Sequence, residues 1–320
     1  ISSELFIIFR LHFCNLFLSK QPTMSEESIL QIRELNKRYG NLIALNNLNL
    51  HVQKGSVYGL LGPNGSGKTT TLSIALGILK PTAGEYYWFN QTPSAQTRLR
   101  IGSLIEEPNF YPYLTLCDNL RIIASIKKVP EEDINRVLGI TNLLKRKYSR
   151  FRHLSSGLKQ RLALAAVLLG DPDVLVLDEP TKSLDPEGFS DLRKIIHEQN
   201  QQGKTIILAS HILAEVEKVC THVGILKSGE LIMEGKVEDI LQGASVIYVD
   251  TDTPEKLIRA LSNSDMVEEY KQEEEGFQII LKKEYKASDL NQYLVKQEVI
   301  LNKLESKKNT LEKEFLELIK

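Results

Sequence analysis

The chain is poor in cysteine, and its few thiols lie far apart. Cys14, Cys117 and Cys220 are the three cysteines in 320 residues. None of them has the close neighbour that a metal site or a redox-active dithiol requires. Such isolated thiols are typical of a reducing cytoplasm, so we expect them to be chemically inert.

The chain also lacks an excess of either charge. Lys and Arg total 40 and Asp and Glu total 41, for a formal net charge of −1. No global basic field therefore favours nucleic acid as a partner. No internal repeat or low-complexity tract is present, which argues against a solenoid. With 42% hydrophobic and 25% charged residues, the chain can bury one large core and a smaller second one.

A long hydrophobic run is missing as well. Residues 5–18 are apolar, but Arg10 and His12 interrupt them, and a spanning helix needs about 20 apolar residues. This segment predicts neither an anchor nor a signal peptide. Because Met24 opens a polar stretch, we interpret residues 1–23 as a non-native extension or the product of an upstream reading frame. An amphipathic helix on a membrane surface is the alternative, although the polar residues are few for a second face.

One glycine-rich segment dominates the rest of the chain. It follows an apolar run at 57–61 and precedes a helix-like run at 70–79, which is the strand–loop–helix setting of a phosphate-binding loop. Its residues are Gly62, Pro63, Asn64, Gly65, Ser66, Gly67, Lys68, Thr69 and Thr70.

The spacing has a physical basis. The glycines let successive backbone N–H groups turn toward a polyphosphate, and the following helix presents its positive end to the anion. Lys68 would reach the β- and γ-phosphates, and the Thr69 hydroxyl would bind Mg²⁺. A flexible turn without function has no need of Lys-Thr at this position. The sequence thus predicts ATP and Mg²⁺ as ligands.

A second nucleotide signature ends the apolar run at 174–177. Asp178 and Glu179 follow it directly, as expected at the ligand-facing end of a central parallel strand. We expect Asp178 to lie in the Mg²⁺ shell and Glu179 to orient or deprotonate the attacking water. The alternative is an ordinary acidic turn after a buried strand, but the presence of a phosphate loop in the same chain argues against it.

Together these segments resemble the ATP-binding cassette (ABC) ATPases, the energy-coupling subunits of membrane transporters. A further motif before the second strand, residues 154–161, is similar to the signature of that family. The resemblance implies that Ser155 and Gly157 contact the γ-phosphate held by a partner subunit. Ser156 and Leu158 depart from the commonest Gly and Gln at these positions.

Other roles follow from the resemblance alone. Tyr39 resembles the aromatic residue on which adenine stacks, although a tyrosine that closes a hairpin is the alternative. Asp185 lies in a segment, 183–185, that resembles the loop crossing the dimer interface. His211, after the strand-like run 205–209, resembles the switch histidine that contacts the γ-phosphate.

Position 106 departs from most of the family. Glu106 stands where a Gln is usual, and this variant is similar to bacterial exporters of lantibiotics and bacitracin-like peptides. A carboxylate there would add negative charge near Mg²⁺ and could bind it. The alternative is a surface acidic pair before a proline.

An aromatic segment, residues 109–114, follows Glu106. It is either a docking site for the cytoplasmic helix of a partner or part of the hydrophobic core.

The fold that we predict is α/β, with a mostly parallel sheet flanked by helices, antiparallel opening strands at 29–35 and 44–52, and further strands at 205–208 and 223–226. We assign 24–243 to the ATPase, including a helical subdomain at about 107–170. Residues 244–320 form a small α/β appendage of unassigned function, in which the charged run 271–275 predicts a solvated turn.

The function implied is ATP hydrolysis in an exporter. The resemblance implies a homodimer of cassettes and an integral membrane permease as a separate polypeptide, with this subunit on the inner face of the cell membrane. The alternative is a free-standing ATPase or a regulatory ATP sensor. Long inserted coiled coils, as in related chromosome ATPases, have no room between Lys68 and Asp178. The transported molecule stays open.

Overall fold

The computed structural model describes residues 28–106, 109–182, 184–241, 246–273, 276–282, 284–307 and 311. The extension that we expected at residues 1–23, Ser183 of the expected interface loop, and most of the chain after 307 lie outside this range.

A three-stranded antiparallel sheet begins the described part of the chain, and its first two strands are the antiparallel pair that we predicted. Its strand order is β2-β1-β4, and Gly40 makes the turn from β1 to β2 with φ 56°, a conformation that glycine adopts without strain. Inward-facing residues such as Leu30, Ile32 and Leu35 are buried. The strands are β1 (Ser28–Tyr39), β2 (Leu42–Gln53) and β4 (Ala83–Trp88).

The second sheet has six strands in the order β5-β6-β7-β3-β8-β9. All neighbours are parallel except β8 and β9. Strands β3, β6 and β7 are buried along their whole length, as expected of apolar runs covered on both faces. The bounds are β3 (Val57–Leu61), β5 (Ile101–Leu104), β6 (Val174–Asp178), β7 (Thr205–Ser210), β8 (His222–Lys227) and β9 (Glu230–Lys236).

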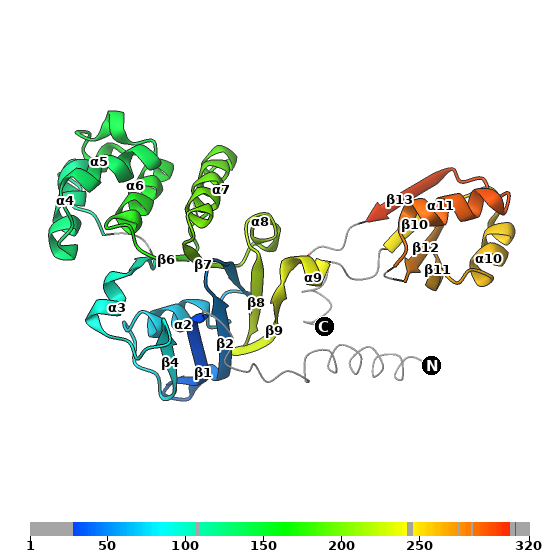
Figure 1. Ribbon diagram of the computed structural model, residues 1–320, viewed down its shortest axis with the longest axis horizontal. Helices are drawn as coiled ribbons and strands as arrows, with labels where there is room; N and C mark the ends of the chain where they lie inside the picture. The colour runs from blue at the N-terminus through cyan, green and yellow to red at the C-terminus, as the bar shows by residue number, and fades with distance from the viewer. Residues whose placement is uncertain are drawn as a thin grey trace.

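Helices surround this sheet, and α4, α5 and α6 gather at one end of it as a helical subdomain (Figure 1). Side-chain oxygens of Thr115, Ser155 and Asp185 cap α4, α6 and α7, since such oxygens accept the unpaired N–H groups of a first turn. The helices are α2 (Lys68–Ala75), α3 (Ala95–Leu99), α4 (Leu116–Lys127), α5 (Glu132–Ile140), η1 (Leu144–Arg146), η2 (Phe151–His153), α6 (Ser156–Leu168), α7 (Pro186–Gln201), α8 (Leu213–Val216) and α9 (Val237–Leu241).

The appendage is a third sheet with two helices. Its elements follow one another as β-α-β-β-α-β, and the antiparallel strand order is β11-β12-β10-β13, the arrangement of a split βαβ motif. Ile247, Phe277, Leu257 and Leu290 belong to a hydrophobic core of its own. The elements are β10 (Val246–Asp250), α10 (Pro254–Ser262), β11 (Val267–Glu273), β12 (Gly276–Leu281), α11 (Ala287–Lys296) and β13 (Lys303–Lys307).

The predicted α/β class is confirmed, with corrections in detail. Strands β4, β5, β9 and β11 were not predicted. The charged run at 271–275 is not simply a turn: β11 continues through Lys271 to Glu273, which pairs with Gly276, and residues 274 and 275 lie outside the described range. Among the helices that the structure describes, none combines the length and apolar character needed to cross a bilayer.

Candidate functional site

Three neighbouring strands bring the predicted site residues to one edge of the six-stranded sheet. Strand β7 lies between β3 and β6, with Leu61 opposite Ser210 and Asp178 opposite Ala209. The strands are parallel, so their carboxyl ends meet there. The phosphate loop, Asp178-Glu179 and His211 each begin where one of these strands ends, in the crevice where open α/β sheets bind ligands.

Glycines shape the phosphate loop. Gly67 has φ 107°, and a Cβ there would lie 2.7 Å from a Leu45 methyl carbon and 2.9 Å from the Ala44 carbonyl oxygen. A Cβ on Gly62 would lie 2.4 Å from the Leu226 carbonyl oxygen. Both positions therefore require glycine, because no larger residue fits without moving backbone.

The tip of the loop is open to solvent while its base is buried. Pro63, Asn64 and Gly65 are exposed, whereas Ser66 is 2% exposed and its hydroxyl has no hydrogen-bond partner among the described residues. Lys68, which is 6% exposed, donates from Nζ to the carbonyl oxygens of Gly62 (2.8 Å) and Pro63 (3.2 Å). The ammonium group is thus held inside the loop, where a bound phosphate would meet it.

Thr69 and Asp178 are in direct contact. The Thr69 hydroxyl donates to Asp178 Oδ2 at 2.7 Å, while Oδ1 of Asp178 is buried and unpaired among the described groups. Burial raises the pKa of Asp178, the hydrogen bond from Thr69 opposes this, and the charges of Glu179 and Glu106 add to the rise. A buried carboxylate oxygen without a partner is costly unless a cation or donor joins it.

Glu179, His211 and Lys68 form a second contact group. Glu179 Oε2 lies 2.8 Å from His211 Nδ1, and Glu179 Oε1 lies 3.7 Å from Lys68 Nζ. Glu179 has φ 47°, and its N–H donates to the Ala209 carbonyl oxygen at 2.9 Å. The chain thus turns out of β6 in a left-handed conformation that costs a non-glycine residue about 1 kcal/mol or more. Such strain is common at functional positions.

Glu106 follows β5, the neighbour of β6, and its side chain is exposed. It too has a positive φ, of 59°. Burial is the main cause of the raised pKa of Asp178, and the charge of Glu106 makes a small further contribution to that rise. The structure thus places Glu106 at the same end of the sheet, and its direct binding of Mg²⁺ stays a prediction.

Tyr39 lies at the end of β1, paired with Leu42 across the turn. Its ring is 46% exposed, with Lys37 Nζ 5.0 Å from the ring centroid. The residue therefore closes a hairpin and still offers an open ring. Adenine stacking there stays a prediction.

The signature residues lie at the start of α6. Ser155 caps the helix by accepting the Leu158 N–H at 3.5 Å, and Gly157 lies beside Leu184. Gln160 donates to the Pro180 carbonyl oxygen at 2.9 Å, which ties α6 to the loop after Glu179. Among the described residues, no hydrogen bond or ion pair joins Ser155 or Gly157 to the phosphate loop. Asp185 caps α7 by accepting the Gly188 N–H at 2.8 Å.

The sequence of this chain is similar to those of known proteins. Residues 45–182 match the model of the family described as ABC transporter. The lantibiotic transport ATP-binding protein SrtF of Streptococcus pyogenes is 40% identical over 209 residues, which cover 64% of this chain and 90% of SrtF. The chain belongs to the ABC transporter family. It is an ATPase of the ATP-binding cassette type, as the signature predicted.

Two further relatives extend the comparison. The bacitracin transport ATP-binding protein BcrA of Bacillus licheniformis is 32% identical, and the match covers 91% of this chain and 97% of BcrA. The solved dimer of the cassette MJ0796 bound to ADP and Pi has a TM-score of 0.59 and 26% identity, covering 65% of this chain and 99% of that chain. The match to BcrA leaves less than a tenth of this chain uncovered, so it includes at least part of the appendage.

The cassette contains a support for the phosphate loop that the sequence did not suggest to us. The Gly229 N–H donates to the Ser66 carbonyl oxygen at 3.0 Å, and the Asn46 N–H donates to the Gly229 carbonyl oxygen. A Cβ on Gly229 would lie 2.7 Å from the Ala44 carbonyl oxygen. The available signal was Ser228-Gly229 between two apolar runs, a common turn dipeptide.

The aromatic segment at 109–114 divides between the two roles left open for it. Phe110 packs on the main core of the cassette, with its ring centroid 5.1 Å from that of Phe151. Tyr111 and Tyr113 are 53% and 67% exposed. Core packing thus accounts for Phe110, and the two tyrosines are open to a partner.

Proposed function

We propose that this cassette hydrolyses ATP at the Lys68–Glu179–His211 group to drive a separate membrane permease, as part of an exporter for antibiotic-like peptides. The observation that supports the chemistry is the meeting of these three side chains at the ends of β3, β6 and β7. The peptide cargo is suggested by the relatives, which are named for lantibiotic and bacitracin transport.

The residues present fit a Mg²⁺ ion. Asp178 Oδ1 is buried without a partner, and the Thr69 hydroxyl lies against the same carboxylate. Within the described residues no group of three or more His, Cys, Asp or Glu could hold a metal, which suits an ion that takes its other ligands from phosphate and water. Thr69 and Asp178, with Glu106 beside them, would hold it. When bound, Mg²⁺ neutralises charge on the phosphates.

The side chains divide the hydrolytic step between them. Lys68 would leave the carbonyl oxygens of its own loop for the phosphates and balance the negative charge that develops there. Glu179 would align a water molecule and take its proton as the water oxygen attacks the γ-phosphorus, while the bond to the β-phosphate oxygen breaks. His211, bonded to Glu179 in the structure, would hold that carboxylate in position.

A second copy of the chain would complete each site. Within the described part of the chain, no hydrogen bond or ion pair joins Ser155 or Gly157 to the phosphate loop, and MJ0796 was solved as a dimer. We therefore propose a homodimer in which ATP lies between the phosphate loop of one cassette and the α6 N-terminus of the other. We also propose residues 244–320 as a separate domain, and the inner membrane face as the place of action, through the permease.

The test is the variant Glu179→Gln, with Glu187→Gln on the exposed first turn of α7 as its control. Glu179→Gln should bind ATP, lose phosphate release by about two orders of magnitude or more, and sediment as a dimer with ATP. Glu187→Gln should behave as wild type. Normal turnover by Glu179→Gln would contradict the assignment.

Coupling to a permease needs a separate experiment. The wild-type chain is captured from native membranes, and mass spectrometry identifies the proteins that co-purify with it in stoichiometric amount. A protein with several membrane spans is expected, and its addition should raise ATP turnover. Recovery without such a protein would favour a free-standing ATPase.

A further inference from the structure

A basic surface lies on the helical subdomain directly before the signature. The sequence between Asp133 and Asp171 has no Asp or Glu, although the whole chain is nearly neutral. Its cations concentrate just ahead of Ser155 and at the start of α6: Lys145, Arg146, Lys147, Arg150, Arg152 and Lys159.

These cations are not matched by carboxylates. In the part of the chain that the structure describes, none of the six has an Asp or Glu within ion-pair distance. Lys147 and Lys159 instead lie over the rings of Tyr148 and Phe151, at 5.0 and 5.3 Å from the centroids. The other four are exposed. The surface therefore carries uncompensated positive charge.

Exposed tyrosines share this surface. Backbone hydrogen bonds join residues 147–152 to residues 112–117, among them Phe151 N–H to Leu114 O (3.0 Å) and Arg152 N–H to Pro112 O (2.9 Å). Tyr113 and Tyr148, which are 67% and 73% exposed, therefore lie on the two joined segments that also carry Arg150 and Arg152.

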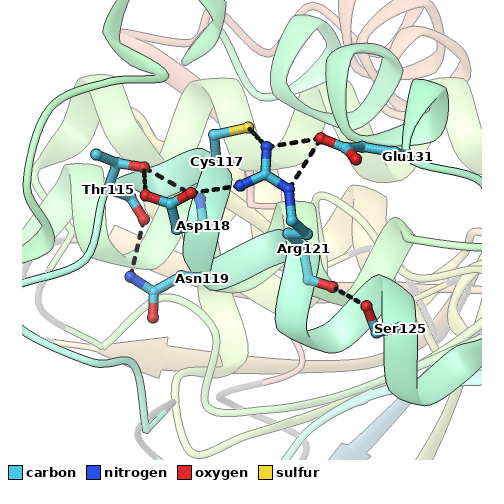
Figure 2. A network of polar contacts seen from close by, with 7 residues as sticks. All are labelled: Thr115, Cys117, Asp118, Asn119, Arg121, Ser125 and Glu131. Carbon is cyan, nitrogen blue, oxygen red and sulfur yellow. Dashed lines mark hydrogen bonds and ion pairs between the residues drawn. The ribbon is translucent and has the colours of Figure 1, made fainter.

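Two acidic side chains of the helical subdomain, on α4 and just before α5, are already paired with a cation. Figure 2 shows Arg121 between Asp118 and Glu131, at 2.5 and 2.6 Å. Thr115 also bonds Asp118, and with Arg121 it keeps the pKa of that carboxyl below its ordinary value. This network fixes the first turn of α4, which pairs with the basic segment through the Cys117 N–H and the Lys147 carbonyl oxygen.

We propose that Lys145, Arg146, Arg150 and Arg152, together with Tyr113 and Tyr148, bind the anionic headgroups of a lipid bilayer. Clustered Lys and Arg attract anionic lipids, and tyrosine favours the headgroup region because its ring is apolar and its hydroxyl is polar. The choice of a membrane over other polyanions rests on the proposed function, which places the cassette beside a membrane subunit. Contact there would act on the segment that leads into Ser155.

The test measures binding of the whole chain to phosphatidylcholine vesicles with and without phosphatidylglycerol, by co-sedimentation at low and high salt. Binding is expected only with phosphatidylglycerol, and it should weaken with salt. Each cation removed should weaken binding about fivefold, the equivalent of about 1 kcal/mol per Lys or Arg near an anionic surface. The variant changes Lys145, Arg146, Arg150 and Arg152 to Gln. Its matched control changes four exposed cations of the appendage to Gln: Lys256, Arg259, Lys271 and Lys296.

Two further arms separate the membrane from other partners. Tyr113→Ser with Tyr148→Ser should weaken vesicle binding while leaving retention on immobilised polyphosphate unchanged. Equal loss in the control variant, or no vesicle binding at low salt, would overturn the proposal. The chain is also tested on nanodiscs of phosphatidylcholine with and without a permease. If it binds only the nanodiscs that hold the permease, its partner is an acidic segment of a protein and the proposal is overturned. ATP binding and Glu179-dependent turnover, measured without lipid, test the proposed function separately.

Discussion

Glu234 lies on β9, where its carboxylate contacts Tyr58 of β3 in the same sheet and His51 of β2 in the opening sheet. Tyr58, which is 1% exposed, donates to Glu234 Oε1 at 2.6 Å, and the His51 N–H donates to the same atom at 3.3 Å. Gly224 makes this possible, since a Cβ there would lie 2.2 Å from the Tyr58 hydroxyl. Burial raises the pKa of Glu234 despite these two hydrogen bonds, which act to lower it.

This environment predicts a pH-dependent stability. Over the range above the ordinary Glu pKa (about 4.3), the folded chain holds more protons at Glu234 than the unfolded chain, so stability falls as pH rises. Glu234→Gln keeps the acceptor oxygen and removes the charge. It should be more stable than wild type at pH 7.5, on the order of 1 kcal/mol, and the difference should shrink at acid pH.

Urea unfolding at several pH values measures this effect, because titration of other groups affects both proteins alike. Glu269→Gln, on the exposed side of β11, should show no such trend. A difference between wild type and Glu234→Gln that stays constant with pH would contradict the raised pKa.

Asp185 has a structural role in the cassette and a predicted role between cassettes, and two variants separate them. Asp185→Ala removes the acceptor for the Gly188 N–H and should cost about 1 kcal/mol of stability. Asp185→Asn keeps the helix cap, because Asn caps as well as Asp. If the carboxylate acts at the dimer interface, Asp185→Asn should unfold like wild type and turn over ATP more slowly. Unchanged turnover would limit Asp185 to capping.

At the residue scale the sequence predicted that the phosphate loop and the end of the second nucleotide strand serve one ligand site, and the structure brings these segments to the same edge of the sheet. Lys68, Thr69, Asp178 and Glu179 could be placed because a loop and a strand end allow few positions for them. The left-handed backbone of Glu179 could not be predicted, because it depends on the hydrogen bond to Ala209 in the next strand. Such tertiary contacts have no local sequence pattern.

At the scale of elements, α4 and α6 are joined by a partly buried ammonium group. Lys127 Nζ donates to the carbonyl oxygens of Ala166 (3.2 Å) and Leu169 (3.1 Å), which α6 leaves unpaired at its end. Burial lowers the pKa of Lys127, so this contact carries a desolvation cost. Lys127→Met should still destabilise the chain by about 2 kcal/mol, because two carbonyl groups lose a charged donor. Lys128→Met, at the exposed neighbour, should change stability by less than about 0.5 kcal/mol. Thermal unfolding of both variants checks this, and equal effects would refute the link.

The sequence predicted the elements whose residues are buried in a regular pattern, because such burial leaves a regular hydrophobic pattern in the sequence. Strand β3 was predicted at its observed bounds, since every residue in it is buried. Strand β4 is exposed over its first three residues, and β5 has four residues that include Gly102 and Ser103. An edge strand that buries few side chains has only a weak hydrophobic pattern in its sequence. Strands β4 and β5 are therefore specified mainly by pairing and packing with their neighbouring strands.

At the scale of the whole molecule, the cassette and the appendage have separate cores. The buried residues of the appendage lie between Ile247 and Val299 and include none from the two cassette sheets. Leu311, beyond β13, is buried in the main cassette core, and its N–H donates to Glu217 at 3.1 Å. One described residue thus returns to the cassette after the appendage ends.

Separate cores predict separate unfolding. Leu257→Ala removes a fully buried side chain of α10 and should destabilise the appendage by about 3 kcal/mol. Calorimetry should show one transition lowered by this variant and another raised by ATP, because a ligand stabilises only the unit that binds it. Val295→Ala, 64% exposed on α11, is the matched control and should leave both transitions in place. A single transition that responds to both ATP and Leu257→Ala would mean that the appendage and the nucleotide site unfold together, and that the contact at Leu311 couples them.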